Sequence, residues 1–300
     1  RDGLKYAADL INRAKDLNAF VAEKDKYREK LWSIQLEISK AKNPLINNKD
    51  ASVLDPISND VATRWNSTYL LLSQLLVLYE AIKRLQKDLA KDKERDVRNN
   101  AKALEKLLLD DDDLLGIQEL VELLGPFAHV ITIVGGDHYP TLSMMLPLVR
   151  ILQEHLYQKE ETLTHPIIHD VRDEIELSFG ERWKEPGPEG YVAAMLDPRF
   201  KNLGFEPAKF ESTKDKLKCR MMEYIENNNY SLPNNNLPTF LLSSLFKETT
   251  HQSCPVETKL KIYFDMPKMA KYDLSDPLYK KNNLLTFWHD NKSSLSLMAC

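Results

Sequence analysis

Apolar side chains recur at steps of three and four residues through long parts of this chain, and that spacing constrains the fold more than any other feature. Residues 4–38 carry it as one or two amphipathic segments, and residues 70–85 carry it as a wide apolar face after N-cap candidates at residues 66–68. Residues three and four apart share one face of an α helix, and an apolar face must be buried. The spacing therefore predicts a mostly helical protein.

Further helices are predicted downstream, each preceded by capping residues or a first-turn proline. They are expected near residues 114–124, 141–156, 166–183, 207–227 and 256–269. Residues 191–195 fit either a helix or a strand. Prolines and asparagines at residues 43–59 and 227–238 indicate loops, the first with or without a short strand leading into Val61.

Composition and charge set broad limits on function. The 300 residues are 43% hydrophobic and 29% charged, which suits a substantial core in one or two domains. A formal net charge of -4 excludes a strongly basic nucleic-acid binder, so any DNA contact must come from local patches. No apolar run approaches the roughly 20 residues of a membrane span, and we expect no membrane partner.

Cysteines, histidines and aspartates show no persuasive metal-ligand spacing. The cysteines are Cys219, Cys254 and Cys300. They are far apart and odd in number, which favours a reducing compartment. His165 and His169 stand four apart, but Pro166 places His165 at a helix entrance, where capping and surface chemistry suffice. The aspartates at residues 110–113 precede an apolar helical pattern, so helix capping is the favoured explanation for them as well.

The run Asp-Val-Ala-Thr-Arg-Trp-Asn-Ser-Thr-Tyr at residues 60–69 is the most specific motif in the chain. It resembles the Thr-Arg-Trp-Asn-Ser-Thr-Tyr signature of hAT-family transposases and of their host-derived relatives with zinc-finger BED domains. In that family the signature stands at the entrance to a large helical insertion.

Two further groups of motifs follow in the order that the family shows. Leu-Gly-Pro-Phe at residues 124–127, Tyr-Pro-Thr at 139–141 and Leu-Asp-Pro-Arg-Phe-Lys at 196–201 resemble its central elements. Leu-Thr-Phe-Trp at residues 285–288 resembles the opening of its C-terminal dimerisation region, although Phe287 replaces the first of two adjacent tryptophans. The resemblance spans most of the chain.

The resemblance implies a mostly α-helical chain in three parts. Residues 1–63 would be the remnant of an RNase H-like α/β domain, residues 64–270 a large all-helical insertion, and residues 271–300 the truncated start of the hAT C-terminal dimerisation region. We expect an internal piece of a longer protein. That parent protein would bind DNA in the nucleus as a homodimer or higher oligomer.

The resemblance also implies a chain that is catalytically incomplete and no enzyme by itself. Active family members use two aspartates and one glutamate to hold divalent metal ions such as Mg²⁺. Those aspartates would precede residue 1, and the glutamate would follow residue 300. Glu-Arg-Trp at residues 181–183 is a partial look-alike in the wrong order. We expect no catalytic residue, metal site or cofactor in this chain, and zinc only in a BED finger outside it.

Arg64, Trp65 and Lys201 are the candidate DNA contacts. A guanidinium bonds phosphates and an indole stacks on unpaired bases, and the resemblance places Arg64 and Trp65 near the family's catalytic centre. Lys201 opens a locally basic stretch that extends to residue 220. The alternatives stay open: Trp65 packs in the core, Arg64 pairs with an acid such as Asp60, and the basic stretch is a solvated helix face.

An apolar cluster near the end of the sequence is the candidate dimerisation surface. It consists of Leu284, Leu285, Phe287 and Trp288. It suits burial against a partner chain or against the chain's own helices. The sequence leaves three functions open. They are a DNA-binding and dimerisation module, which the motifs favour, a helical protein-interaction scaffold with no DNA binding, and a fragment of an active metal-dependent DNA transposase.

Overall fold

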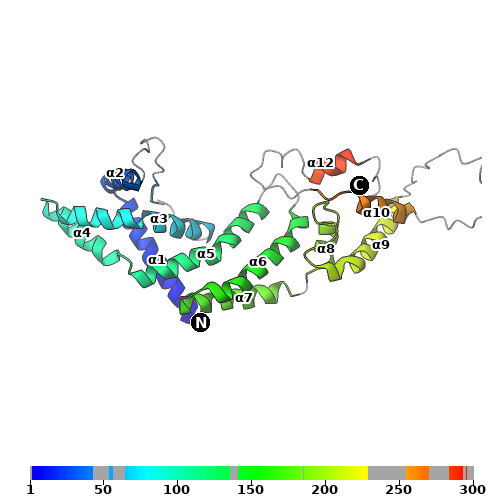
Figure 1. The fold of residues 1–300 in the computed structure, drawn as a ribbon, viewed down its shortest axis with the longest axis horizontal. Coiled ribbons are helices and arrows are strands. Elements are labelled where there is room, and N and C mark those ends of the chain that lie inside the picture. Colours follow the sequence, from blue (N-terminus) through cyan, green and yellow to red (C-terminus); the bar gives the residue numbers. More distant parts are fainter. Residues whose placement is uncertain are drawn as a thin grey trace, which may run out of the picture. The chain divides into compact units, whose positions relative to one another are not determined.

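A computed structural model describes residues 2–42, 54–56, 65–135, 141–184, 186–228, 255–269, 284–292 and 295. Every regular element in these ranges is a helix (Figure 1), which confirms the prediction of a mostly helical fold. The ranges contain no strand, so the RNase H-like α/β remnant has no support. The strand considered near Val61 lies outside the described residues.

The two helices α1 (Asp2–Ala22) and α2 (Asp25–Lys42) occupy most of the segment expected to be that α/β remnant. Leu10, Leu17 and Leu31 on these helices are at most 1% exposed and lie in one core with helices from later in the chain. Their spacing explains the difference, because apolar residues at three- and four-residue steps form one face of a helix but fall on both faces of a strand.

The described chain divides into two compact units. Unit 1 comprises residues 1–132 and 152–182, and unit 2 comprises residues 133–151 and 183–300. The chain therefore leaves unit 1 and later returns to complete it. The division places α1 and α2 in one unit with the helices that follow them.

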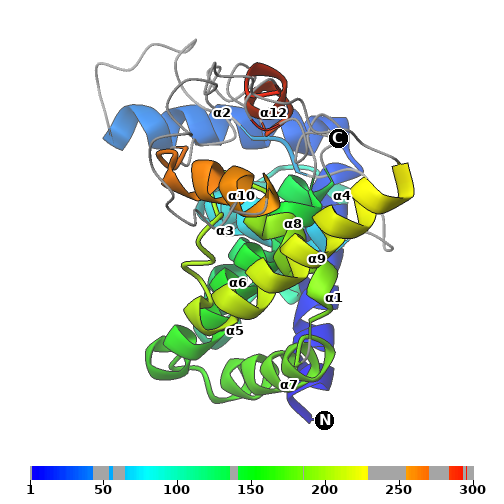
Figure 2. The ribbon, with the colours of Figure 1, turned by 90° about the vertical axis from the view of Figure 1, so that its right-hand side faces the viewer.

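Unit 1 is a bundle around α1 and α3. Its helices are α1, α2, α3 (Trp65–Ala90), α4 (Arg95–Leu107), most of α5 (Asp111–Val134), the later part of α6 (Leu142–Thr162) and α7 (Pro166–Arg182). α1 contacts α2, α3, α4 and α7. Figures 1 and 2 both show the start of α1 beside α7. The leucines of α3, including Leu72, Leu75 and Leu85, fill the centre of the core.

Unit 2 is smaller and contains the motifs from the later part of the sequence. Its helices are the start of α6, α8 (Pro188–Met195), the 3-10 turn η1 (Pro207–Lys209), α9 (Phe210–Asn228), α10 (Pro255–Asp265) and α12 (Leu284–Asp290). α9 contacts both α8 and α10. Residues 191–195, for which helix and strand were both open, belong to α8.

One described helix, α5, is long and apolar enough by length and composition to cross a membrane, with a mean hydropathy of 1.4 in its most apolar window. This differs from the prediction that no segment of the chain resembles a membrane span. A helix buried in a protein core has the same composition. Ile117, Leu120 and Leu123 of α5 are buried in the core of unit 1, and 39% of the apolar window is buried.

Candidate functional site

The Thr-Arg-Trp-Asn-Ser-Thr-Tyr motif leads directly into α3, whose first residue is Trp65. Arg64 and the side chain of Trp65 lie outside the described residues, so their contact with DNA stays a prediction. Later in the motif, the ring of Tyr69 lies over Gly125, where a Cβ would stand 3.6 Å from the phenol oxygen. The fold therefore brings this motif against the Leu-Gly-Pro-Phe motif of α5.

Lys201 is placed differently from the expectation of a DNA contact. It is only 4% exposed, and its Nζ donates to the carbonyl oxygens of Tyr263 at 2.9 Å, Phe264 at 3.1 Å and also Met266. These carbonyls belong to the last turn of α10 and the residue after it, where a helix leaves acceptors unpaired. Burial, with the nearby charge of Lys268, lowers the pKa of Lys201. Lys201 thus caps a helix inside unit 2.

The rest of the Leu-Asp-Pro-Arg-Phe-Lys motif is a buried polar turn. Asp197 is fully buried, and its carboxylate accepts from the Ser143 hydroxyl at 2.8 Å. The same carboxylate accepts from the backbone N–H of Arg199 at 3.0 Å and from its guanidinium Nε at 2.9 Å. A buried carboxylate needs hydrogen bonds and an opposite charge around it, because removing one member of a buried ion pair leaves the charge of the other uncompensated. The motif therefore organises the interior of unit 2.

The basic stretch after Lys201 is largely ion-paired on the surface of α9. Lys214 pairs with Glu211 at 3.7 Å, Arg220 pairs with Glu189 at 2.7 Å, and Lys218 pairs with Glu257. These pairs are all partly exposed. They favour the alternative of a solvated helix face over a continuous phosphate-binding stripe.

Two of the proposed dimerisation residues on α12, Phe287 and Trp288, pack against their own chain. Trp288 stacks on Tyr263 of α10, with ring centroids 5.5 Å apart and an interplanar angle of 25°. Phe287 meets Trp288 edge-on at 5.3 Å and Tyr263 at 6.4 Å. Leu284, Phe287 and Trp288 are half-buried, and the side chain of Leu285 lies outside the described residues. Part of each aromatic surface thus stays open to solvent.

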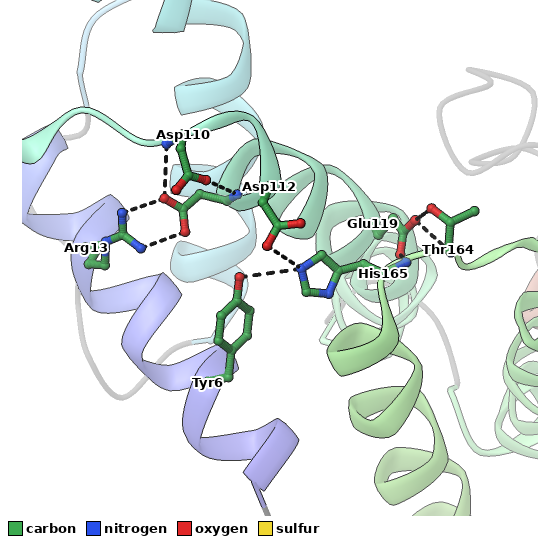
Figure 3. A network of polar contacts seen from close by, with 8 residues as sticks. Tyr6, Arg13, Asp110, Asp112, Glu119, Thr164 and His165 are labelled. Atoms are coloured by element: carbon green, nitrogen blue, oxygen red, sulfur yellow. Dashed lines mark hydrogen bonds and ion pairs between the residues drawn. The ribbon is translucent and has the colours of Figure 1, made fainter.

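A polar network whose members the sequence does not link to one another joins α1, α5 and α7 (Figure 3). The predicted capping by aspartates is confirmed at the centre of this network. Asp110 Oδ1 accepts from the N–H of Asp113 at 2.8 Å, and Asp113 Oδ2 accepts from the N–H of Asp110 at 3.1 Å. Arg13 of α1 then binds both carboxylate oxygens of Asp113, at 2.5 and 2.6 Å. This contact fastens α1 to the start of α5.

The second half of the network surrounds His165 at the entrance of α7. Its ring is buried and stacks on Tyr6 with centroids 5.5 Å apart, and its Nε2 lies 3.5 Å from both the Tyr6 hydroxyl and Asp112 Oδ2. Burial and the nearby aspartates, Asp113 first, raise the pKa of Tyr6. His165 Nδ1 has no hydrogen-bond partner among the described residues. The helix begins at Pro166 as predicted.

Glu119 completes the network from the middle of α5. Its carboxylate accepts from the N–H of Thr164 at 2.8 Å, the Thr164 hydroxyl at 2.5 Å and the N–H of His165 at 3.0 Å. Burial alone would raise the Glu119 pKa, but these hydrogen bonds outweigh it and lower the pKa below the ordinary 4.5. The ionised carboxylate is thus the form that this site stabilises.

Three acids of the network have structural partners: Asp110 and Asp113 cap the start of α5, Asp113 also pairs with Arg13, and Glu119 accepts from the residues that lead into α7. Within the part of the chain that the structure describes, no group of three or more His, Cys, Asp or Glu side chains is placed to hold a metal ion.

The chain matches no protein-family model, no curated protein and no solved structure. A relationship to hAT transposases consequently rests on the sequence motifs.

Proposed function

We propose that this chain is the DNA-binding and dimerisation module of a hAT-type transposase or of a nuclear protein derived from one, catalytically incomplete by itself. The observation that carries the proposal is the Thr-Arg-Trp-Asn-Ser-Thr-Tyr run at residues 63–69, followed by the other motifs in the family's order. The helical fold agrees with a large helical insertion. In this proposal α1 and α2 belong to the helical part.

Arg64 and Trp65 are the proposed DNA contacts, and Lys201 is not among them because its ammonium group is buried. The pair stands where a long helix, α3, begins. The N-terminal end of a helix carries partial positive charge, which adds to the attraction between the Arg64 guanidinium and a phosphate. Trp65 would supply a stacking surface for an unpaired base.

DNA binding by the 300-residue chain tests this assignment. Fluorescence anisotropy with a labelled duplex that carries a single-stranded overhang, at several salt concentrations, measures both affinity and its salt dependence. We expect Arg64→Ala to weaken binding about tenfold and to reduce the salt slope by about one.

The matched control is Arg84→Ala. Arg84 lies on the same helix α3, is 46% exposed and pairs with Glu80 at 3.1 Å, so the substitution removes the same charge elsewhere. Its affinity should stay within about twofold of the unaltered chain. Equal losses in both variants, or no salt-sensitive binding at all, would contradict the proposed contact.

A helical protein-interaction scaffold without DNA affinity is the second candidate, and the ion-paired basic residues of α9 favour it. Lys218 and Arg220 are held by Glu257 and Glu189, which leaves that face poorly suited to a DNA backbone. This candidate predicts that Arg64→Ala leaves every binding property unchanged.

The third candidate is a fragment of an active metal-dependent DNA transposase. Genomic DNA on both sides of the segment decides it, because an active parent must encode two aspartates upstream and a glutamate downstream in frame. An intact frame with those carboxylates replaced would point to a protein that binds DNA without cutting it.

A further inference from the structure

Tyr263 connects three separate parts of unit 2. It is fully buried, and its hydroxyl donates to the backbone carbonyl of Met195 at 2.8 Å, at the end of α8. Its own carbonyl accepts from Lys201 Nζ at 2.9 Å. Its ring stacks on Trp288 of α12. One residue thus touches α8, the Leu-Asp-Pro-Arg-Phe-Lys turn and the candidate dimerisation cluster.

We propose that Lys201 and Tyr263 are positioning residues that fasten α12 to the Leu-Asp-Pro-Arg-Phe-Lys turn and so set the geometry of the self-association surface. The role in self-association rests on the proposed function, in which α12 opens the dimerisation region. The fastening itself is a property of the contacts within unit 2 and is measurable separately.

Lys201 holds the end of α10 against the Leu-Asp-Pro-Arg-Phe-Lys turn. An ammonium group has three donors on a flexible stem, and Lys201 directs them at three carbonyls around the end of α10. The turn that carries Lys201 is itself held by the buried pair of Asp197 and Arg199. The end of α10 is therefore tied to a rigid part of the unit.

Tyr263 links the end of α10 to α12 through its ring. Lys201 Nζ lies 5.4 Å from the centre of the Tyr263 ring, a favourable distance for a cation–π contact. Trp288 stacks on the same ring, and Phe287 approaches its edge. The orientation of the α12 aromatics hence depends on the ring that Lys201 and Met195 hold in place.

The half-buried aromatic residues of α12 offer surface for self-association of the chain. Phe287 and Trp288 use part of their surface on Tyr263 and leave the remainder exposed. Aromatic side chains dominate interface energetics when they are presented in a fixed orientation, because less conformational entropy is then lost on binding. A loosened α12 would keep its composition and lose affinity for a second copy.

Hydrogen exchange in the 300-residue chain tests the fastening directly. We expect Lys201→Met to speed exchange in peptides that cover α12 and the end of α10, by about tenfold or more, with α9 close to unchanged. The matched control is Lys209→Met, since Lys209 is an exposed lysine on η1. Uniformly faster exchange throughout unit 2 would mean only general destabilisation and would overturn the positioning role.

A pair of Tyr263 variants separates the ring from the hydroxyl. Tyr263→Phe keeps the stack and loses one hydrogen bond, so the fluorescence contribution of Trp288, defined by subtracting a Trp288→Phe variant, should stay near that of the unaltered chain. Tyr263→Leu should move that emission to longer wavelength, because the indole becomes wetter. Identical emission in both variants would contradict a role for the ring.

Self-association, measured by sedimentation equilibrium, links the fastening to function. Lys201→Met and Tyr263→Leu should weaken it about tenfold, and Lys209→Met should not. A chain that stays monomeric without any substitution would refute the proposed dimerisation, while hydrogen exchange would still decide the fastening. Unchanged self-association with a loosened α12 would refute the functional role of Lys201 and Tyr263 alone.

Discussion

Glu119 in the middle of α5 binds both the backbone N–H and the hydroxyl of Thr164, a residue 45 positions away that stands two before the start of α7. The carboxylate also accepts from the N–H of His165, which stands just before the first residue of α7, as the glutamate of a capping box does within its own helix. A side chain of α5 therefore helps to stabilise the start of α7, together with the local sequence.

Replacing this carboxylate should cost much more than replacing a nearby exposed one. We expect Glu119→Gln to lower the free energy of unfolding by about 2 kcal/mol, since hydrogen bonds to a charged acceptor are lost in a buried site. Glu122→Gln is the control, because Glu122 lies one turn further along α5 and its side chain is 48% exposed. That change should cost about 0.5 kcal/mol. Urea unfolding followed by circular dichroism measures both, and equal costs would contradict the capping role.

The same site predicts a pH dependence. Because the folded pKa of Glu119 lies below its ordinary value of 4.5, the site's contribution to stability is present above pH 4.5 and is lost as pH falls through the folded pKa. The stability difference between the unaltered chain and Glu119→Gln should therefore shrink below pH 4.5. A difference that stays constant down to acid pH would show that the carboxylate is not preferentially ionised in the folded state.

The contact between Arg13 and Asp113 is suited to a double-mutant cycle. Asp113 is 4% exposed and also closes the cap of α5, whereas Arg13 is 50% exposed. Asp113→Ala should cost about 2 kcal/mol and Arg13→Gln about 1 kcal/mol or less. The coupling energy should be near 1 kcal/mol in favour of the pair. A coupling of zero in urea titrations would mean that the two residues act independently.

We expect the contribution of Tyr191 to the free energy of unfolding to be lost at alkaline pH. Its hydroxyl donates to Glu206 at 2.8 Å, and burial together with this carboxylate raises the pKa of Tyr191 to about 12. A raised folded pKa keeps the contribution intact below pH 10, the ordinary value, and removes it as pH rises towards 12. Tyr191→Phe should flatten this part of the stability profile. Tyr157→Phe, at a residue that is 69% exposed, should leave it unchanged.

Two neighbouring positions on α3 test the assignment of the core of unit 1. Leu75 is 1% exposed, and Leu75→Ala should lower the free energy of unfolding by about 3 kcal/mol, because a cavity replaces a packed side chain. Val77 is 67% exposed, and Val77→Ala should change it by less than about 0.5 kcal/mol. Similar values at both positions in thermal or urea unfolding would mean that the helix is turned differently.

The helical architecture could be predicted because the side chains that build the core obey the 3.6-residue period. Leu75, Leu78 and Leu85 illustrate this, since their spacing alone marks the face of α3 that is buried. The caps at Asp110 and Pro166 were equally visible, because they act on residues within one turn of themselves. The expectation of an α/β remnant came from the order of motifs, and the periodicity of residues 4–38 already pointed to helices.

The role of Lys201 could not be predicted from its neighbours in sequence. It stands in a basic stretch, where a lysine is normally solvated, yet its acceptors belong to a helix 62 or more residues further on. The contact of Tyr6 with His165 has the same origin, because only the folded bundle brings α1 to α7. For Phe287 and Trp288, the partner within the chain, Tyr263, carries no signal in the spacing of the apolar residues.

Unit 1 is discontinuous in sequence, so its two parts are synthesised at different times. Tyr6 meets a partner that a ribosome adds 159 residues later, so at about 5–20 residues per second the two are separated by on the order of ten seconds or more. Throughout that time the side of α1 that packs on α7 has nothing to cover it. The face of α1 that packs on α7 is therefore buried only after the residues up to 182 have been added.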